Sequence, residues 1–177
     1  SSQLPIFIDG YSTAIFDHCL FENNTFSIYL KNQSTAIFID CKFKNDKKNS
    51  ILSNFSYTEF VNCHFFNHEG KAIFAKDSSE IYISNSDFIN CKLGAVTIVN
   101  SSKMILDGQI LIENCSNTSL RAANNSEING HDVTIKNING NAINLDNSSG
   151  FFINFKIYKT FHPTIASLGF NSNPVFH

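Results

Sequence analysis

A short phrase of cysteine, phenylalanine and asparagine returns at almost fixed intervals along the chain. It reads DCKFKN at 40–45 and NCHFFN at 62–67, and it is loosened to SDFIN at 86–90. Aligning the copies gives an apolar anchor that recurs every 22–24 residues. The anchors are Phe21, Phe43, Phe65, Phe88, Ile112, Ile135 and Ile157. A period of this length is typical of solenoids, in which each repeat packs against its neighbours.

Polar and apolar columns accompany the anchor. An asparagine follows two residues after the first six anchors, at Asn23, Asn45, Asn67, Asn90, Asn114 and Asn137. Further apolar columns lie seven or eight and about sixteen positions after the anchor. Within a repeat the pattern alternates, as in IFIDCKF at 37–43, where we expect Ile37, Ile39 and Phe43 to share the inner face. Three short strands in each repeat, with polar corners, predict one coil of a parallel β-helix.

The predicted fold is all-β: a single-stranded, right-handed parallel β-helix of about seven coils that forms one domain over residues 1–177. Equivalent residues would stack about 4.8 Å apart, with Phe and Ile ladders inside. We expect the ladder asparagines to turn inward at a corner and to bond to one another. Opposite charges one place after the anchor, such as Glu113 and Lys136, fit this register. A β-sandwich is the alternative, which the asparagine column disfavours.

The chain ends and the composition limit the partners. Residues 7–17 already read as the end of an earlier coil, so we expect a segment of a longer chain, whose further coils or a second copy cover the open edges. A net charge of -2 gives no electrostatic case for nucleic acid or anionic membrane. No apolar run approaches the roughly 20 residues of a membrane span.

Two families carry similar repeats. The phrase resembles the right-handed parallel β-helix repeat of the pectate-lyase-like superfamily. It is also similar to the passenger repeats of chlamydial and trichomonad polymorphic membrane proteins, which carry Phe-x-x-Asn followed by Gly-Gly-Ala-Ile. FENN at 21–24 matches the first motif, and GKAI at 70–73, LGAV at 93–96 and GNAI at 140–143 are degenerate forms of the second. The first resemblance implies carbohydrate as substrate or ligand, and the second implies an adhesin.

The sequence gives little support to catalysis. The Asn-Thr-Asp and Asp-Asp motifs by which galacturonan hydrolases resemble one another are absent. Inverting glycoside hydrolysis needs two carboxyl groups about 6.5–9.5 Å apart. Glu113 and Asp132, with Asp107, lie on neighbouring predicted coils and are weak catalytic candidates, although solvated charges at corners are the plainer interpretation.

Neither a cofactor nor a metal site is predicted. The six histidines have no HxH or HExxH spacing, and we expect them to be ordinary surface residues. His18 and His64 would share one outer face but stand two coils, or about 10 Å, apart.

The five cysteines fall in two columns. Cys19, Cys41 and Cys63 occupy one predicted inner column, where they would act as small buried hydrophobic groups. Cys91 and Cys115 form a second column at a corner and could be joined by a disulfide. Because the number is odd, at least one thiol is free unless it pairs with another chain.

Two sets of residues are candidates for surface contacts. Outward aromatic residues could form a surface for a partner or a sugar, and they are Phe38, Phe66, Tyr82 and Tyr158. Scattered apolar side chains on a sheet face are the plainer interpretation. Asn-x-Ser/Thr sequons in predicted corners are candidate glycosylation sites, at Asn32, Asn54, Asn100, Asn124 and Asn147.

Three functions stay open. The leading hypothesis is a non-enzymatic β-helix outside the cell or at its surface, an adhesin, passenger or stalk segment that contacts a host or cell-surface protein or glycan. The second is a carbohydrate-active or carbohydrate-binding β-helix. The third is an internal structural component of a fibre, which would keep its thiols reduced and carry no glycans.

Overall fold

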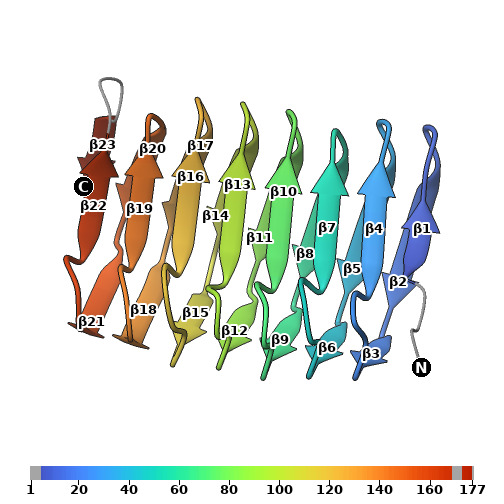
Figure 1. Cartoon of the computed structure of the whole chain (residues 1–177), viewed down its shortest axis with the longest axis horizontal. Helices are drawn as coiled ribbons and strands as arrows, with labels where there is room; N and C mark the ends of the chain where they lie inside the picture. The colour runs from blue at the N-terminus through green and yellow to red at the C-terminus, as the bar shows by residue number, and fades with distance from the viewer. Residues whose placement is uncertain (1–4, 169–172, 177) are drawn as a thin grey trace.

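The computed structural model describes residues 5–168 and 173–176, and every regular element in them is a β-strand. The strands form three sheets (Figure 1). Sheet A contains β1 (Ile6–Ile8), β4 (Ile28–Lys31), β7 (Ile51–Asn54), β10 (Ile73–Lys76), β13 (Val96–Val99), β16 (Leu120–Ala123), β19 (Ile143–Asp146) and β22 (Ile165–Leu168). Sheet B contains β2 (Thr13–Asp17), β5 (Thr35–Ile39), β8 (Tyr57–Val61), β11 (Glu80–Ser84), β14 (Lys103–Asp107), β17 (Glu127–His131), β20 (Ser149–Ile153) and β23 (Asn173–Phe176). Sheet C contains β3 (Leu20–Glu22), β6 (Lys42–Lys44), β9 (His64–Phe66), β12 (Asp87–Ile89), β15 (Ile110–Glu113), β18 (Val133–Ile138) and β21 (Lys156–Thr160).

Each strand pairs in parallel with the strand three places before or after it, so three strands make one coil. Figure 1 shows the coils stacked side by side along the long axis of the molecule. The anchor column is in register from Phe21 to Ile157, and the next apolar column is in register from Ile28 to Ile165. The predicted parallel solenoid of about seven coils is confirmed, and the sandwich alternative is wrong.

Two stacks of phenylalanine rings fill the first half of the interior. In sheet B the rings of Phe16, Phe38 and Phe60 lie 4.9 and 5.0 Å apart. In sheet C four anchor rings, from Phe21 to Phe88, follow one another at 4.8, 4.6 and 4.8 Å. These distances follow from the strand spacing, since one residue type in one column must stack at about 4.8 Å.

The prediction that Phe38 lies on the outer surface is wrong. Its side chain is fully buried, whereas Ile37 and Ile39 are only half-buried and point outward. The cause is Asp40, which joins β5 to β6 with a φ of 52°. One left-handed residue shifts the phase of the alternation, so Cys41 and Phe43 face inward on the far side of the corner. The alternating pattern therefore cannot be read straight through 37–43.

The asparagine column stands at the corner between sheets C and A, and its predicted inward direction is wrong. Asn67 and Asn90 are exposed, and all six ladder asparagines have φ between 54° and 61°. Asparagine tolerates this left-handed backbone better than other residues with a Cβ. Of the 25 described non-glycine residues with positive φ, 15 are asparagine, so corner geometry explains why the chain is rich in it. The expected amide ladder forms in part, as from Asn90 Nδ2 to Asn67 Oδ1 at 2.9 Å.

A buried serine ladder takes the inner place at the corner between sheets A and B. Its members are Ser34, Ser56, Ser79, Ser102, Ser126 and Ser148. From Ser79 onward each hydroxyl accepts a hydrogen bond from the backbone N–H of the serine one coil earlier, at 3.1–3.2 Å. Most also donate to a carbonyl two or three residues back in their own coil. The ladder therefore satisfies buried backbone groups where the coil turns.

Candidate functional site

A polar groove runs along the corner between sheets B and C. One part, with a volume of about 610 Å³, crosses four consecutive coils from β12 to β21. Its polar lining includes Asn85, Asp87, Gln109, Asp132, Thr134, Asn154 and Lys156. A second part, of about 540 Å³, lies at the same corner of the first coils and is lined by His18, Cys19, Leu20, Asp40, Lys42, Asn62 and His64. Because equivalent positions of successive coils line it, the groove runs parallel to the solenoid axis.

The corner backbone sets the rim of this groove. Asn85, Asp132 and Asn154 each have a φ between 46° and 58°, where the chain turns from sheet B into sheet C. Gly108 takes the equivalent place with a φ of 78°, and a Cβ there would lie 2.6 Å from Asn85 Oδ1. The glycine leaves Asn85 Oδ1 free to accept a hydrogen bond from the backbone N–H of Gln109 at 3.2 Å.

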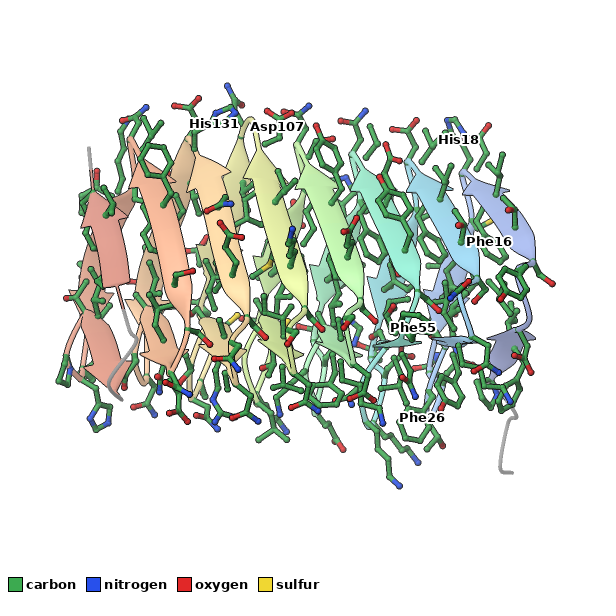
Figure 2. All side chains as sticks on the ribbon, turned by 90° about the horizontal axis from the view of Figure 1, so that it is seen from above. Phe16, His18, Phe26, Phe55, Asp107 and His131 are labelled. Atoms are coloured by element: carbon green, nitrogen blue, oxygen red, sulfur yellow. The ribbon has the colours of Figure 1, made fainter. Side chains whose placement is uncertain are left out.

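A chain of hydrogen bonds leads from sheet B to the groove. Tyr82 donates to Asp107, and His131 lies between two carboxylates. Its Nε2 is 2.8 Å from Asp107 Oδ1, and its Nδ1 is 3.0 Å from Asp132 Oδ2. Asn154 Nδ2 also donates to Asp132. Figure 2 places His131 and Asp107 next to each other along one edge of the molecule.

These contacts shift the pKa values of three groups in the network. The hydrogen bond with Asp132 raises the pKa of His131. The hydrogen bonds from His131 and then Asn154 lower the pKa of Asp132, so this carboxyl stays ionised near neutral pH. The hydrogen bond to Asp107 and then burial raise the pKa of Tyr82 to about 12. Asp132 is therefore a hydrogen-bond acceptor and a poor proton donor, whereas a general acid works best with a pKa near the working pH.

The other catalytic candidate, Glu113, lies elsewhere. It ends β15 at the opposite side of sheet C, where its carboxylate is 3.2 Å from Lys136 Nζ and accepts a hydrogen bond from Asn137 at 3.3 Å. The expected charge pair is thus present. The structure joins Asp107 and Asp132 through His131, but it does not bring Glu113 to them.

The predicted aromatic binding residues do not form one surface. Phe66 and Tyr158 occupy the same outer column of sheet C but are four coils apart. Phe66 is half-buried under Lys44 Nζ, which lies 5.8 Å from the ring centroid, while Tyr158 is 51% exposed. Tyr82 is in sheet B and belongs to the hydrogen-bond chain, and Phe38 is in the core.

All five cysteines are free thiols in this structure. Cys41 and Cys63 are buried, and burial raises the pKa of Cys63 to about 12. Cys91 and Cys115 are buried on adjacent coils, and the neighbouring Cys115 thiol and then burial raise the pKa of Cys91. A disulfide between these two stays a prediction.

The predicted glycosylation sites lie at the corner between sheets A and B, where the fold explains the sequon pattern. Four of the five asparagines have a left-handed φ of 51–58°. In four of the five sequons the serine two residues later, such as Ser102 after Asn100, belongs to the buried serine ladder. Corner geometry thus places Asn and Ser at sequon spacing, and glycosylation stays a prediction.

Sequence reasoning missed several residues of this region. His131 was expected to be an ordinary surface residue, and His68, expected at the surface, is fully buried. The signal for the groove was present three residues before each anchor, where the column reads His18, Asp40, Asn62, Asn85, Gln109, Asp132 and Asn154. A polar residue in every copy of one column indicates a continuous polar edge on a solenoid.

Comparison with known proteins supports the architecture. Residues 1–117 match a family model described as a right-handed β-helix region, which agrees with the predicted handedness. No curated protein matches the chain. The finer resemblance to polymorphic membrane protein repeats is not confirmed. Across the described residues, no helix is long and apolar enough to span a membrane.

Proposed function

We propose a function for this chain, which belongs to the right-handed β-helix family. It is a non-enzymatic rod that binds a linear glycan in its polar groove, and it acts outside the cell or at its surface. The observation that carries this proposal is the groove itself, to which each of four consecutive coils contributes a polar corner residue. An extended polymer that lies along the solenoid axis would meet similar groups at steps of about 4.8 Å.

The lining suits sugar hydroxyls. The carboxylate of Asp132 accepts hydrogen bonds, Asn154 and Gln109 offer amides that both donate and accept, and Lys156 donates. Asp87 and Asp132 against Lys156 leave the groove without a strong positive charge, so a neutral or weakly charged glycan fits better than a polyanion.

The rest of the molecule supplies a rigid support. Parallel sheets with stacked cores and serine and asparagine corner ladders hold each groove residue at a fixed height along the axis. This supports an adhesin, passenger or stalk segment in which further coils extend the surface. The surface location itself rests on the resemblance of the repeats and on the corner sequons.

Glycan binding can be tested on the purified chain. A glycan array followed by calorimetric titration of the best linear oligosaccharide should give saturable binding. Asp132→Ala should weaken binding about 10-fold or more, since a lost hydrogen bond to a charged group costs about 1.5–3 kcal/mol, and Asn154→Ala should weaken it less, since a lost neutral bond costs about 0.5–1.5 kcal/mol. Glu113→Ala, on the far side of sheet C, is the matched control and should bind normally. Equal effects of all three variants, or no glycan binding at all, would refute the proposal.

A hydrolase or lyase is the second candidate, because His131 stands between two carboxylates at the edge of the groove. It predicts release of reducing or unsaturated ends from polygalacturonate or alginate. His131→Ala and Asp132→Ala should abolish that release while Glu113→Ala keeps it. Activity with this pattern would replace the binding proposal.

An internal fibre component is the third candidate, and the native protein distinguishes it. The intact mass should be measured with thiols alkylated without prior reduction. Added sugar mass or a disulfide would place the protein outside the cell. A bare mass with five alkylated thiols would favour the internal fibre.

A further inference from the structure

A group of three metal-ligating side chains lies at the first end of the groove. Among the residues that the structure describes, one ligand atom from each of Asp17, His18 and Asp40 lies within 4.8 Å of the others. Asp17 ends β2, His18 turns the corner after it, and Asp40 is the equivalent corner residue of the next coil. The group thus links two coils that are 22 residues apart in sequence.

The backbone under these side chains is held firmly. His18 and Asp40 have φ values of 53° and 52°, and the N–H groups of both donate to carbonyls of the next coil, at 2.9 Å each. The side chains themselves are open to solvent, with 75% of His18 and 38% of Asp40 exposed. The solenoid therefore fixes the backbone positions of His18 and Asp40, while an ion has free access to their side chains.

The imidazole of His18 is oriented from one side. Its Nδ1 hydrogen-bonds to Asp17 Oδ1 at 2.6 Å, and with Nδ1 as donor the Nε2 atom carries the free lone pair. A carboxylate on the far nitrogen is the usual support of a histidine that binds a metal. Nε2 lies 3.8 Å from Asp40 Oδ2, too far for a hydrogen bond. It is close to the separation of about 3.4 Å between two ligand atoms of one tetrahedral zinc ion.

The second Asp–His–Asp group of the molecule makes the contrast. At His131 both ring nitrogens already touch a carboxylate, at 2.8 and 3.0 Å, which leaves no gap for an ion between His and Asp107. Both groups lie on the same edge of the molecule, His18 near one end and His131 farther along (Figure 2). The chain therefore holds a matched pair, one group open and one closed by hydrogen bonds.

We propose that His18 Nε2 and a carboxylate oxygen of Asp40 bind one divalent first-row transition-metal ion, with Zn²⁺ as the best fit, while Asp17 orients the imidazole. One imidazole nitrogen with carboxylate oxygens is a donor set that zinc accepts, and the nitrogen disfavours Ca²⁺ and Mg²⁺. Two protein ligands leave the remaining coordination positions to water. His18 and Asp40 also line the groove, so the ion would lie at its edge. The site is independent of the proposed glycan binding.

The test is a calorimetric titration of the metal-stripped chain with ZnCl₂. We expect one saturable site, and MgCl₂ should give no heat of binding. His18→Ala should abolish the site. Asp17→Asn should weaken it about 10–100-fold, as loss of an orienting partner does. Because these side chains are exposed, the circular dichroism of each variant should match that of the parent chain.

His131→Ala and His64→Ala are the matched controls, and both should keep the site. The proposal is overturned if Zn²⁺ does not bind, or if His18→Ala binds as well as the parent chain. It is also overturned if His131→Ala loses the same site, since the closed group would then hold the ion. A Co²⁺ titration followed by visible absorption provides a second readout, and its bands should disappear in His18→Ala alone.

Discussion

The coils up to Phe88 and the coils after it fill the same interior in different ways. In the first three coils, sheet B carries a smaller residue followed two positions later by a ring, as in Ala36 and Phe38, whereas the coil of Phe88 already has Ile81 and Ile83 there. In the second part the equivalent places hold medium pairs such as Met104 and Leu106, and then the pair Ile128 and Gly130. The next pair returns to small plus ring, as Gly150 and Phe152, and the last described pair is Pro174 and Phe176.

The difference shows that the side chains inside each coil keep a similar total volume, although the residue types change from coil to coil. A close-packed interior tolerates exchanges that keep the total volume, but not those that change it. Where sheet B brings a ring into the core, the residue two positions before it is smaller, as with Ala36, Thr58 and Gly150. Identical rings stack well only with identical neighbours, so the phenylalanine half should be the more sensitive to a single truncation.

The largest effect is expected for Phe43→Ala. This fully buried ring is stacked between Phe21 and Phe65 and also meets Phe38 edge-on at 5.4 Å. We expect a loss of about 3–5 kcal/mol in the free energy of unfolding, measured by urea denaturation. Ile135→Ala, at the equivalent anchor of the second part, should cost about 1 kcal/mol less, because no aromatic stacking is lost there. An equal or larger cost for Ile135→Ala would break the comparison.

A larger side chain in the core of the second part should lower the stability of the fold. In Gly130→Ala the new Cβ would lie 2.9 Å from Leu106 Cβ and 3.3 Å from the Phe155 ring. We expect a cost of about 1–3 kcal/mol in the same denaturation experiment, as for other overpacked cores. Asn129→Ala, at the half-buried outward neighbour, loses one hydrogen bond to Glu127 and should cost less, about 1 kcal/mol at most. A neutral Gly130→Ala would show that this coil is loosely packed.

The stability of the first part should depend on pH more strongly than that of the second, because the first part contains the buried His68. Burial lowers the pKa of this imidazole, whose Nδ1 accepts the backbone N–H of buried Asp46 at 3.2 Å. The unfolded chain takes up a proton below about pH 6.5 and the folded chain does not, so stability should fall as pH decreases through that value. The loss cannot exceed about 1.4 kcal/mol per pH unit for one proton.

The measurement is the unfolding free energy at pH 7.5 and 5.5, in the parent chain and in His68→Asn. His131 acts in the opposite direction, since its raised pKa stabilises the fold at low pH, so the difference between the two chains isolates His68. Hydrogen-exchange protection, corrected for the intrinsic exchange rate at each pH, should fall at pH 5.5 in β6 to β9 rather than in β15 to β18. The same pH dependence in both chains would mean that His68 has no part in it.

The sequence repeat correctly predicted the ladders whose residues recur once in every coil. It failed to predict which face a side chain is on where a corner separates two strands. Phe43 and Ile135 were placed correctly because one anchor occurs in every coil. Phe38 was placed on the wrong face because a single left-handed residue, Asp40, shifts the alternation, and no apolar pattern reveals a backbone angle. Correct placement would have required treating each polar corner as a break in phase.

The candidate site was likewise predicted only in part. Asp132 was named from its charge and coil, and the structure places it in the groove. His131 precedes Asp132 in the sequence, but Asp107 reaches His131 only because β14 and β17 end at the same corner one coil apart. Likewise Asp17 and Asp40 are remote in sequence, so the group around His18 has no local motif that a spacing search could find.

The smallest effect should be the same in both halves, because the corners, unlike the cores, are alike throughout. Asn67 and Asn137 have φ values of 61° and 56° at the same corner, three coils apart. Replacing either by alanine forces a Cβ without a compensating amide into left-handed backbone and should cost about 1 kcal/mol, whereas glycine should restore most of it. Urea denaturation of the four variants measures this. A much larger cost at Asn67 than at Asn137 would mean that the phenylalanine stacks transmit strain to the corner, so that core and corner are coupled rather than independent.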